Sequence, residues 1–191
     1  MNDYYNKNAQ NFIKDTIDAD MKEQYLMFEK YLESTNLTIL DLGFGSGRDS
    51  LYFQNKGYDV YSLDPVLSFC EHGKKIGLKR IYQQSVQEMS FVDEFDGIWA
   101  CASLLHIPST ELVNVFDKCY IALKENGVMY CSFKYGEFEG ERNGRFFTDL
   151  NEDKLNELID NTKFKILELS ITNDARTDRN DRWINIMLKK V

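Results

Sequence analysis

A short run of glycines stands where a chain leaving a strand would have to turn sharply. The segment Asp41-Leu-Gly-Phe-Gly-Ser-Gly47 places three glycines at alternate positions. Glycine adopts the positive φ angles that tight turns need, and without a Cβ its backbone can lie close to a ligand. The segment is therefore typical of a cofactor-binding turn at the start of a helix, although a Gly-rich loop alone is a weak signal.

An acidic residue follows at the distance expected for ribose recognition. Asp64 stands 21 residues after Gly43, at the end of a second apolar run. A carboxylate accepts hydrogen bonds from two neighbouring hydroxyl groups more strongly than a neutral side chain does. The alternative is a plain turn residue before Pro65. Because the glycine turn precedes it, we predict that Asp64 binds a ribose.

His106 is the better placed of the two histidines for proton transfer. It stands just past a predicted buried strand, and imidazole is the side chain whose ordinary pKa lies near neutrality. The alternative is a structural histidine that is hydrogen-bonded before the turn at Pro108. We take His106 as the candidate general base, whereas His72 is expected on the solvated surface of a helix, beside Lys74 and Lys75.

A polar segment over residues 134–145 contains glycines, aromatic residues and both signs of charge. We predict that it forms a lid over a substrate, with a solvated loop as the alternative. Guanidinium groups bind anions bidentately, so arginines of this segment and of a later loop are candidates to hold an anionic substrate. Surface ion pairs are the commoner outcome for such arginines. The predicted substrate-binding residues are Tyr5, Lys134, Tyr135, Arg142, Arg145 and Arg176.

The elements that must position these residues alternate between strands and helices. Two helices are expected over residues 3–33, with Asp18 and Asp20 between them to cap the second. Ser109 is the predicted cap of a later helix. The predicted strands cover 37–42, 58–63, 80–83, 95–101 and 128–134, and the predicted helices end at 56, 75 and 123. This alternation requires a mostly parallel sheet with helices on both faces.

The last part of the chain departs from that alternation. A helix over 152–162 precedes two strands, 165–171 and 183–189, which a short charged loop joins. Strands joined so briefly must be antiparallel. We expect a doubly wound α/β fold with a seven-stranded, mostly parallel sheet and an antiparallel C-terminal strand. The whole chain, 1–191, is expected to form one domain, with residues 1–34 as an N-terminal helical cover and 35–191 as a Rossmann-like core.

Composition narrows the class of protein. The 191 residues carry a formal net charge of −8, so broad nucleic-acid binding is disfavoured, although a local basic patch could serve a particular RNA. No signal peptide is visible, and no run approaches the roughly 18 apolar residues of a membrane span. The four cysteines include no Cys-x-x-Cys pair, so we predict no metal site, and reduced thiols favour a cytoplasmic location.

The segment Ile39-Leu-Asp-Leu-Gly-Phe-Gly-Ser-Gly-Arg48 resembles the first motif of class I S-adenosylmethionine-dependent methyltransferases. The resemblance extends to the order of the predicted elements, including the antiparallel final strand. A dinucleotide-binding Gly-x-Gly-x-x-Gly fingerprint fails, because Arg48 occupies its third glycine position. Phe44 departs from the family pattern, which commonly has a small residue or cysteine there.

The resemblance implies that the cofactor is S-adenosyl-L-methionine and the product S-adenosyl-L-homocysteine. The glycines would contact the methionine part, Asp41 would order the loop and the cofactor's ammonium, and Ser85-Val86 would meet the adenine, where aspartate is more usual. Arg48 would pair with the cofactor carboxylate, or else form a surface ion pair. The implied cofactor-binding residues are Asp41, Gly43, Gly45, Gly47, Arg48, Asp64, Ser85, Val86 and Cys101.

The resemblance also implies methyl transfer, and the acceptor that we expect is a small molecule. No Asn-Pro-Pro-Tyr-like motif follows the fourth strand, where the sequence is Ala102-Ser-Leu-Leu105, which weakens amino groups of bases or glutamine as acceptors. The alternatives are a methyltransferase acting on RNA or protein, a non-catalytic S-adenosylmethionine-binding regulator and, least consistent, a nicotinamide-dependent reductase. The methylated atom and the oligomeric state are left open.

Overall fold

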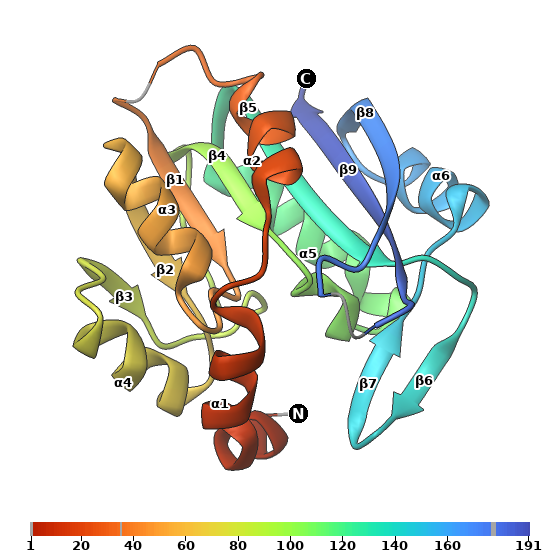
Figure 1. The fold of residues 1–191 in the computed structure, drawn as a ribbon. Coiled ribbons are helices and arrows are strands. Elements are labelled where there is room, and N and C mark those ends of the chain that lie inside the picture. The colour runs from red at the N-terminus through yellow and green to blue at the C-terminus, as the bar shows by residue number, and fades with distance from the viewer. Residues whose placement is uncertain (1, 35, 177–178) are drawn as a thin grey trace.

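A seven-stranded sheet runs through the molecule in the order β3-β2-β1-β4-β5-β9-β8 (Figure 1). The computed structural model describes residues 2–34, 36–176 and 179–191. Neighbouring strands from β3 to β5 are parallel, whereas β9 is antiparallel to both β5 and β8. The predicted doubly wound sheet with an antiparallel last strand is confirmed. The strands are β1 (Thr38–Leu42), β2 (Asp59–Leu63), β3 (Arg80–Tyr82), β4 (Phe95–Ala100), β5 (Leu123–Lys134), β8 (Phe164–Asn173) and β9 (Arg182–Lys190).

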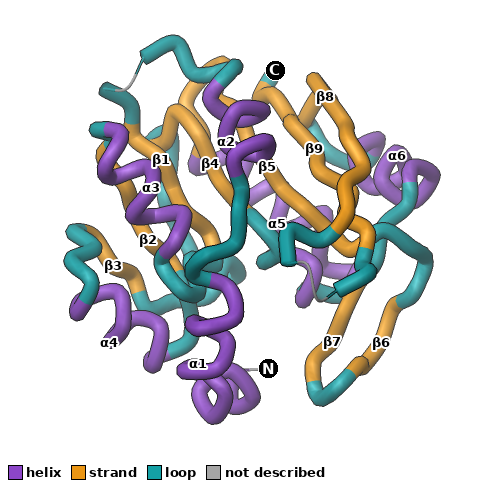
Figure 2. Tube along the Cα trace, viewed as in Figure 1, coloured by secondary structure: helices purple, strands orange, loops and turns teal. Residues whose placement is uncertain are grey.

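Helices cover both faces of this sheet (Figure 2). Apolar residues of α2 and α3 pack on one face, and those of α5 and α6 pack on the other. The first helix, α1, packs on α4 near the carboxyl ends of the parallel strands (Figure 1). The helices are α1 (Asn2–Thr16), α2 (Lys22–Glu29), α3 (Arg48–Lys56), α4 (Leu67–Lys75), α5 (Ser109–Ala122) and α6 (Glu152–Asp160). None of the described helices is long and apolar enough to cross a membrane.

Large aromatic side chains fill the core between the sheet and the α2–α3 face. Phe28, Phe53 and Trp99 are fully buried, and their ring centroids lie 5.2 to 5.5 Å apart. Gly97 of β4 makes room for this cluster, since a Cβ there would come within 2.7 Å of the Phe28 ring. The N-terminal cover is thus anchored on the sheet by apolar packing.

The strand order reverses between β1 and β4, because β1 leads outward to β2 and β3 while β4 leads outward to β5. In doubly wound sheets, a crevice opens at such a switch point, beyond the carboxyl ends of the strands. The turns after β1, β2 and β4 therefore converge on one edge of the sheet. Helix α1 lies at this same edge (Figure 1).

The segment predicted as a lid is more regular than expected. Strands β6 (Glu139–Arg142) and β7 (Arg145–Thr148) form a separate two-stranded antiparallel sheet. Their turn residues Asn143 and Gly144 both have positive φ, at 53° and 73°. Asn-Gly is the commonest two-residue hairpin turn, so the sequence did contain this signal.

The helix cap predicted at Ser109 is wrong. Pro108 occupies the cap position of α5, and Ser109 is the first helical residue. Its backbone N–H donates to Glu139 Oε1 of β6 at 2.9 Å. Between the first two helices, Asp20 Oδ1 accepts from the backbone N–H of Lys22, the first residue of α2, as predicted for a capping carboxylate.

Truncating Phe28 should destabilise the protein far more than truncating its neighbour Leu26. We expect Phe28→Ala to lower the free energy of unfolding by about 3 to 5 kcal/mol, because a fully buried ring leaves a cavity. Leu26→Ala on the same helix should cost about 0.5 kcal/mol or less, since Leu26 is 58% exposed. Urea unfolding measures both, and equal losses would contradict the packing described.

Candidate active site

Two cavities meet at the carboxyl edge of the sheet. The first, of about 370 Å³, lies among α1, the turn after β1, the ends of β4 and β5, and the loop before β9. The second, of about 380 Å³, lies among the turns after β1, β2 and β4. Both are open to a ligand of drug size. The residues that line both cavities, which we call the junction, are Tyr5, Phe12, Gly43, Gly45, Ala102 and His106.

The glycine turn forms the floor of the junction. The backbone N–H of Gly43 donates to Leu63 O of β2 at 2.7 Å, which fixes the turn against the neighbouring strand. Gly45 has φ of +50°, and a Cβ there would lie 3.0 Å from the Phe12 ring. A Cβ at Gly43 would lie 2.5 Å from Ser103 Cβ, so both glycines allow neighbouring side chains to pack directly against the backbone of the turn.

Gly47 has a different place from the one predicted. It lines neither cavity, so its predicted cofactor contact is not supported. It caps α3 with φ of +79°, and a Cβ there would lie 2.7 Å from Ile76 Cδ1. The third glycine serves close packing between helix α3 and the residues after α4.

Asp64 lies where a ribose-binding acid was predicted. Its buried carboxylate lines the second cavity and accepts from the backbone N–H groups of Gly45, at 3.0 Å, and Val66, at 2.9 Å. Burial raises the pKa of Asp64 to about 6, although the two backbone hydrogen bonds oppose that shift. A carboxylate offers about four acceptor positions, so two remain for a ligand.

Two serines that were not among the predicted site residues lie near the end of β4: Ser103 follows β4, and Ser132 belongs to the neighbouring strand β5. The Oγ of Ser103 is buried, lines the second cavity and has no hydrogen-bond partner within the described residues. Ala102, with φ of +50°, donates its backbone N–H to Ser132 Oγ at 2.9 Å. Strained backbone and an unpaired buried hydroxyl are features that recur at ligand sites. Serines after a buried strand were the available signal.

Ser85 and Val86, which were predicted to bind adenine, line the second cavity together with Gln87. Val86 is buried, but the Oγ and backbone N–H of Ser85 both donate to Glu88 Oε2 at 2.8 Å. These bonds lower the pKa of Glu88 and stabilise the turn. The contact of Ser85 and Val86 with adenine stays a prediction, with the hydroxyl of Ser85 already engaged.

Asp41 is a structural residue rather than a cavity residue. It lines neither cavity, and its buried carboxylate accepts from Ser50 Oγ at 2.6 Å. Ser50 Oγ is in turn 2.7 Å from Ser62 Oγ. Burial raises the pKa of Asp41, and the neighbouring Asp49 adds to the rise. Its predicted contact with the cofactor is therefore not supported, whereas its ordering of α3 against β1 and β2 is visible.

Arg48 lines the first cavity, but its guanidinium is already engaged. It binds Asp49 bidentately, at 2.7 and 2.8 Å, and donates to Thr16 O at 3.1 Å. Asp49 also accepts from Trp99 Nε1 at 2.9 Å and from the Tyr25 hydroxyl. These partners hold the pKa of the buried Asp49 below its usual range. The ion pair, which was the alternative for Arg48, is present and half-buried; a pair with a cofactor carboxylate stays a prediction.

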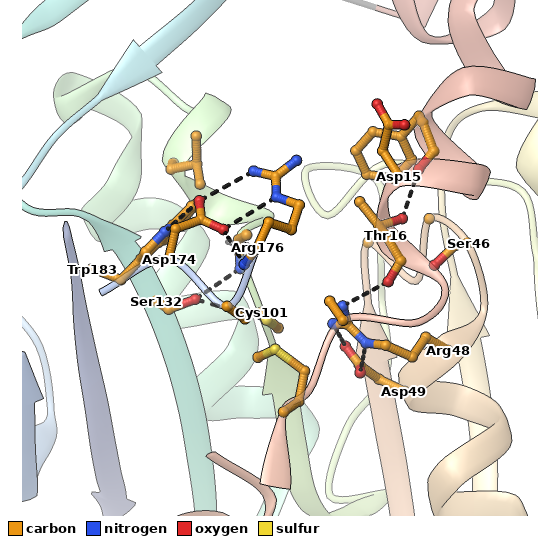
Figure 3. A pocket seen from close by; sticks show the side chains of 18 of the residues that line it. Asp15, Thr16, Ser46, Arg48, Asp49, Cys101, Ser132, Asp174, Arg176 and Trp183 are labelled. Carbon is orange, nitrogen blue, oxygen red and sulfur yellow. Dashed lines mark hydrogen bonds and ion pairs between the residues drawn. The ribbon is translucent and has the colours of Figure 1, made fainter. Parts of the chain in front are cut away.

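The first cavity has two polar walls (Figure 3). On one side Asp174 accepts from Arg176 and from Trp183 Nε1, all at 3.1 Å. On the other side lie Thr16, Arg48 and Asp49, and between the walls lie Cys101 and Ser132 (Figure 3). The pKa of the Cys101 thiol is raised to about 12 by burial, so Cys101 is a thiol at neutral pH.

The ring of His106 is held in one orientation at the junction. Its Nδ1 lies 2.7 Å from Phe146 O, and its Nε2 lies 2.7 Å from the Tyr5 hydroxyl. A carbonyl only accepts, so Nδ1 carries the proton and Nε2 accepts from Tyr5. Arg145 Nη1 donates to the same Tyr5 oxygen at 3.3 Å. His106 is thus neutral, and the Tyr5 hydroxyl occupies its Nε2 at the junction.

Some of the predicted substrate-binding residues line the first cavity, and others line neither cavity. Tyr5, Lys134, Arg145 and Arg176 line the first cavity. Tyr135 and Arg142 line neither cavity, and we withdraw them. The Tyr135 hydroxyl donates to Glu152 at 2.8 Å. Arg142, which lies opposite Arg145 on the neighbouring strand β6, pairs with Asp149 at 2.8 Å. The hydroxyl of Tyr135 and the charge of Arg142 are thus each paired with a neighbouring carboxylate of the protein itself.

Comparisons with known proteins agree with this geometry. A family model described as a methyltransferase domain matches residues 39–127. The predicted methyltransferase YqeM of Bacillus subtilis (strain 168) is 28% identical over 126 residues, which are 60% of this chain and 50% of YqeM. The chain thus spans about half the length of that curated relative.

Solved structures share the fold over nearly the whole chain. The 1,6-didemethyltoxoflavin-N1-methyltransferase of Burkholderia thailandensis, solved with its substrate and S-adenosylhomocysteine, has a TM-score of 0.83 at 18% identity, covering 100% of this chain and 87% of that one. The magnesium protoporphyrin IX methyltransferase of Synechocystis PCC 6803 has a TM-score of 0.77 at 15% identity, covering 100% and 97%. The [4+2]-cyclase SpnF scores 0.76 at 14% identity, covering 99% and 94%.

The seven-stranded sheet with its single antiparallel strand, and a site at the strand switch point, define a Rossmann-like methyltransferase fold. The chain has the fold of class I S-adenosylmethionine-dependent methyltransferases, and its residues 39–127 match the methyltransferase domain model.

His106→Gln should change how stability depends on pH. The pKa of His106 is lowered to about 4, chiefly by burial, against about 6.5 in an unfolded chain. Between these values the unfolded chain binds a proton that the folded protein does not, so stability is full above pH 6.5 and falls as the pH drops toward 4.

We expect the variant to lack this acid-side loss, which amounts to at most about 3 kcal/mol. Urea unfolding of both proteins at about pH 7 and about pH 4.5 measures it. Taking the difference between the two proteins cancels the opposite contribution of Asp64. If wild type and variant differ in unfolding free energy by the same amount at both pH values, the description of His106 as buried and neutral is wrong.

Proposed function

We propose that this protein transfers a methyl group from S-adenosyl-L-methionine to a small-molecule acceptor. The observation that carries the proposal is the pair of cavities that meet at the glycine turn, with the buried Asp64 in one and the Tyr5–His106 pair at their junction. The second cavity would hold the adenosine, and the first would hold the amino-acid part together with the acceptor.

The residues present fit such a cofactor. Gly43 and Gly45 present backbone without a side chain to both cavities, Asp64 has unused acceptor positions, and the buried Ser103 hydroxyl has no partner among the described residues. These are a donor and an acceptor of the kind that ribose hydroxyls satisfy. The amino-acid end would lie near Cys101 and Ala102, at the end of β4.

The cofactor supplies the reactive carbon as a methyl group on a sulfonium. The protein's part is to align the acceptor with that carbon and to exclude water, which the rings of Tyr5 and Phe12 do over the glycine turn. An acceptor that carries a proton also needs a base.

His106 supplies that base through Tyr5 in this proposal. The Tyr5 hydroxyl faces the junction and donates to His106 Nε2. A proton leaving the acceptor would pass to the Tyr5 oxygen while the Tyr5 proton passes to His106 Nε2. Desolvation raises the pKa of Tyr5, so Tyr5 stays protonated at neutral pH and relays a proton instead of holding a charge.

Further aspects of the function remain proposals. The four free cysteines support action in the cytoplasm, and the net charge of −8 argues against broad nucleic-acid binding. No group of three or more histidine, cysteine or acidic residues within the described ranges is arranged for a metal. We propose that residues 1–191 act as one unit, because α1 helps to line both cavities.

Asp64→Asn should weaken the binding of S-adenosylhomocysteine at least tenfold, because a charge-assisted acceptor would be lost from the ribose site. Asp59→Asn is the control, since Asp59 is an exposed aspartate at the start of the same strand. Isothermal titration calorimetry measures both affinities. Unchanged affinity for the Asp64 variant would contradict the ribose assignment, and no binding by the wild type would contradict the proposed cofactor.

Tyr5→Phe should lower kcat by about 10²-fold or more and leave the affinity for S-adenosylhomocysteine unchanged, because the ring remains and only the proton relay is lost. Tyr4→Phe is the matched control from the same helix; its ring also lines the first cavity. The assay follows transfer of labelled methyl groups to extracts of small metabolites. Equal rates for the two variants would remove Tyr5 from the relay.

A further inference from the structure

Arg145 differs from three other basic residues that line the first cavity. Arg48, Lys134 and Arg176 each form an ion pair with an aspartate. Among the described residues, Arg145 has no carboxylate partner; its only hydrogen bond is the 3.3 Å contact with the Tyr5 hydroxyl. Its Nε is buried without any partner. A guanidinium in this state is costly unless something else completes its hydrogen bonds.

Aromatic rings fix the position of this guanidinium. It lies 5.0 Å from the ring centroids of Tyr4 and Phe147 and 5.8 Å from that of Tyr5. The tyrosines come from α1 and Phe147 comes from β7, so two segments from distant parts of the sequence hold Arg145 beside the junction. Rings of this kind attract a cation and keep water away, which strengthens its attraction for an anion.

We propose that the methyl acceptor is a small molecule with an anionic group, a carboxylate or a similar acid, that binds Arg145 while its nucleophilic atom lies at the Tyr5 hydroxyl. This inference rests on the proposed methyl transfer and names the substrate class of the same site. The rings of Phe12, Phe147 and Trp183 also line the first cavity and suit an apolar body on that acid.

The electrostatics of the junction support an anionic acceptor. Burial lowers the pKa of His106 most, and the hydrogen bond to Phe146 O opposes that shift. The cationic side chains of Arg145 from β7 and Lys134 from β5 lower this pKa further. Tyr5 from α1 is its neutral hydrogen-bond donor. An anion beside Arg145 would offset the cationic charge, so the pKa of His106 would rise when the acceptor binds. The base would then be strongest when the substrate is present.

The rival role for Arg145 is to bind the carboxylate of the cofactor. The guanidinium of Arg48 is already paired with Asp49, and Arg145 lines the same cavity, so Arg145 is a second candidate partner for a cofactor carboxylate. The two roles differ in which ligand loses affinity when Arg145 is replaced. An experiment must therefore measure the cofactor product and acid probes separately.

The test uses the full chain with and without saturating S-adenosylhomocysteine. The probes are benzoate, 4-hydroxybenzoate, phenylacetate and indole-3-carboxylate, each paired with its neutral amide, and affinities are measured by calorimetry and ligand-observed NMR. We expect the wild type to bind at least one acid about tenfold or more tightly than its amide, the strength of one charge-assisted pair. Arg145→Gln should abolish that preference.

Arg142→Gln is the matched control, because it removes the same charge from the same hairpin at a residue that lines neither cavity. It should keep the preference for acids. In parallel, NMR of the His106 ring should show its pKa rising when the preferred acid binds to the wild type, and not when its amide binds. Thermal unfolding confirms that each variant is folded.

Equal affinity for acids and amides, or no binding of any acid, would overturn the anionic acceptor while leaving the proposed function intact if S-adenosylhomocysteine binds. If Arg145→Gln weakens S-adenosylhomocysteine as much as it weakens the acid, Arg145 serves the cofactor and the inference is wrong. If S-adenosylhomocysteine fails to bind the wild type, the proposed function fails. The titrations without it still decide whether Arg145 selects acids.

Discussion

The carboxylate of Asp49 links more separate helices and strands than any single apolar contact described above. It accepts hydrogen bonds from Tyr25 of α2, Arg48 of α3 and Trp99 of β4, and Arg48 also donates to Thr16 O at the end of α1. A buried charge is stable only when it is paired and hydrogen-bonded. The N-terminal cover must therefore sit where Tyr25 and Thr16 can complete this network, and that position places α1 over the cavities.

Two segments from distant parts of the chain close the junction. Tyr4 and Tyr5 come from α1, and the hairpin β6–β7 brings Arg145 against them. A Cβ on Gly144, at the tip of that hairpin, would lie only 3.4 Å from the Tyr4 ring. The hairpin and α1 therefore touch beside the site, and each helps to position the other. The acceptor site that we propose exists only because both are in place.

The family model matches the segment that contains the proposed cofactor site, but not Tyr5 and Arg145 of the proposed acceptor site. The methyltransferase domain model covers residues 39–127, which include the glycine turn, Asp64 and the end of β4. Tyr5 and Arg145 lie outside that range. A shared fold supports different reactions, as the likeness to a [4+2]-cyclase shows. The glycine turn and Asp64 of the proposed cofactor site thus lie in the segment that matches the family model, whereas Tyr5 and Arg145 of the proposed acceptor site lie outside it.

The order of the main-sheet strands and of the helices, the glycine turn and the acid after β2 could be predicted from the sequence. These follow from local rules, because apolar periodicity, glycine conformation and spacing along a βαβ unit are properties of short segments. For the same reason the position of Asp64 after the second strand was predicted, whereas its binding to a ribose stays a prediction. The Asn143-Gly144 turn was also available to be predicted.

Which charged residues face the cavities could not be predicted from the sequence and is known only from the tertiary structure. Arg142 and Arg145 are both polar residues of one short hairpin, yet Asp149 neutralises the first while aromatic rings from α1 and β7 surround the second. Asp41 and Gly47 belong to the cofactor motif, but packing against α3 and Ile76 turns them away from the cavities. Pairing and burial depend on contacts between segments far apart in the chain, and no spacing within a single segment contains that information.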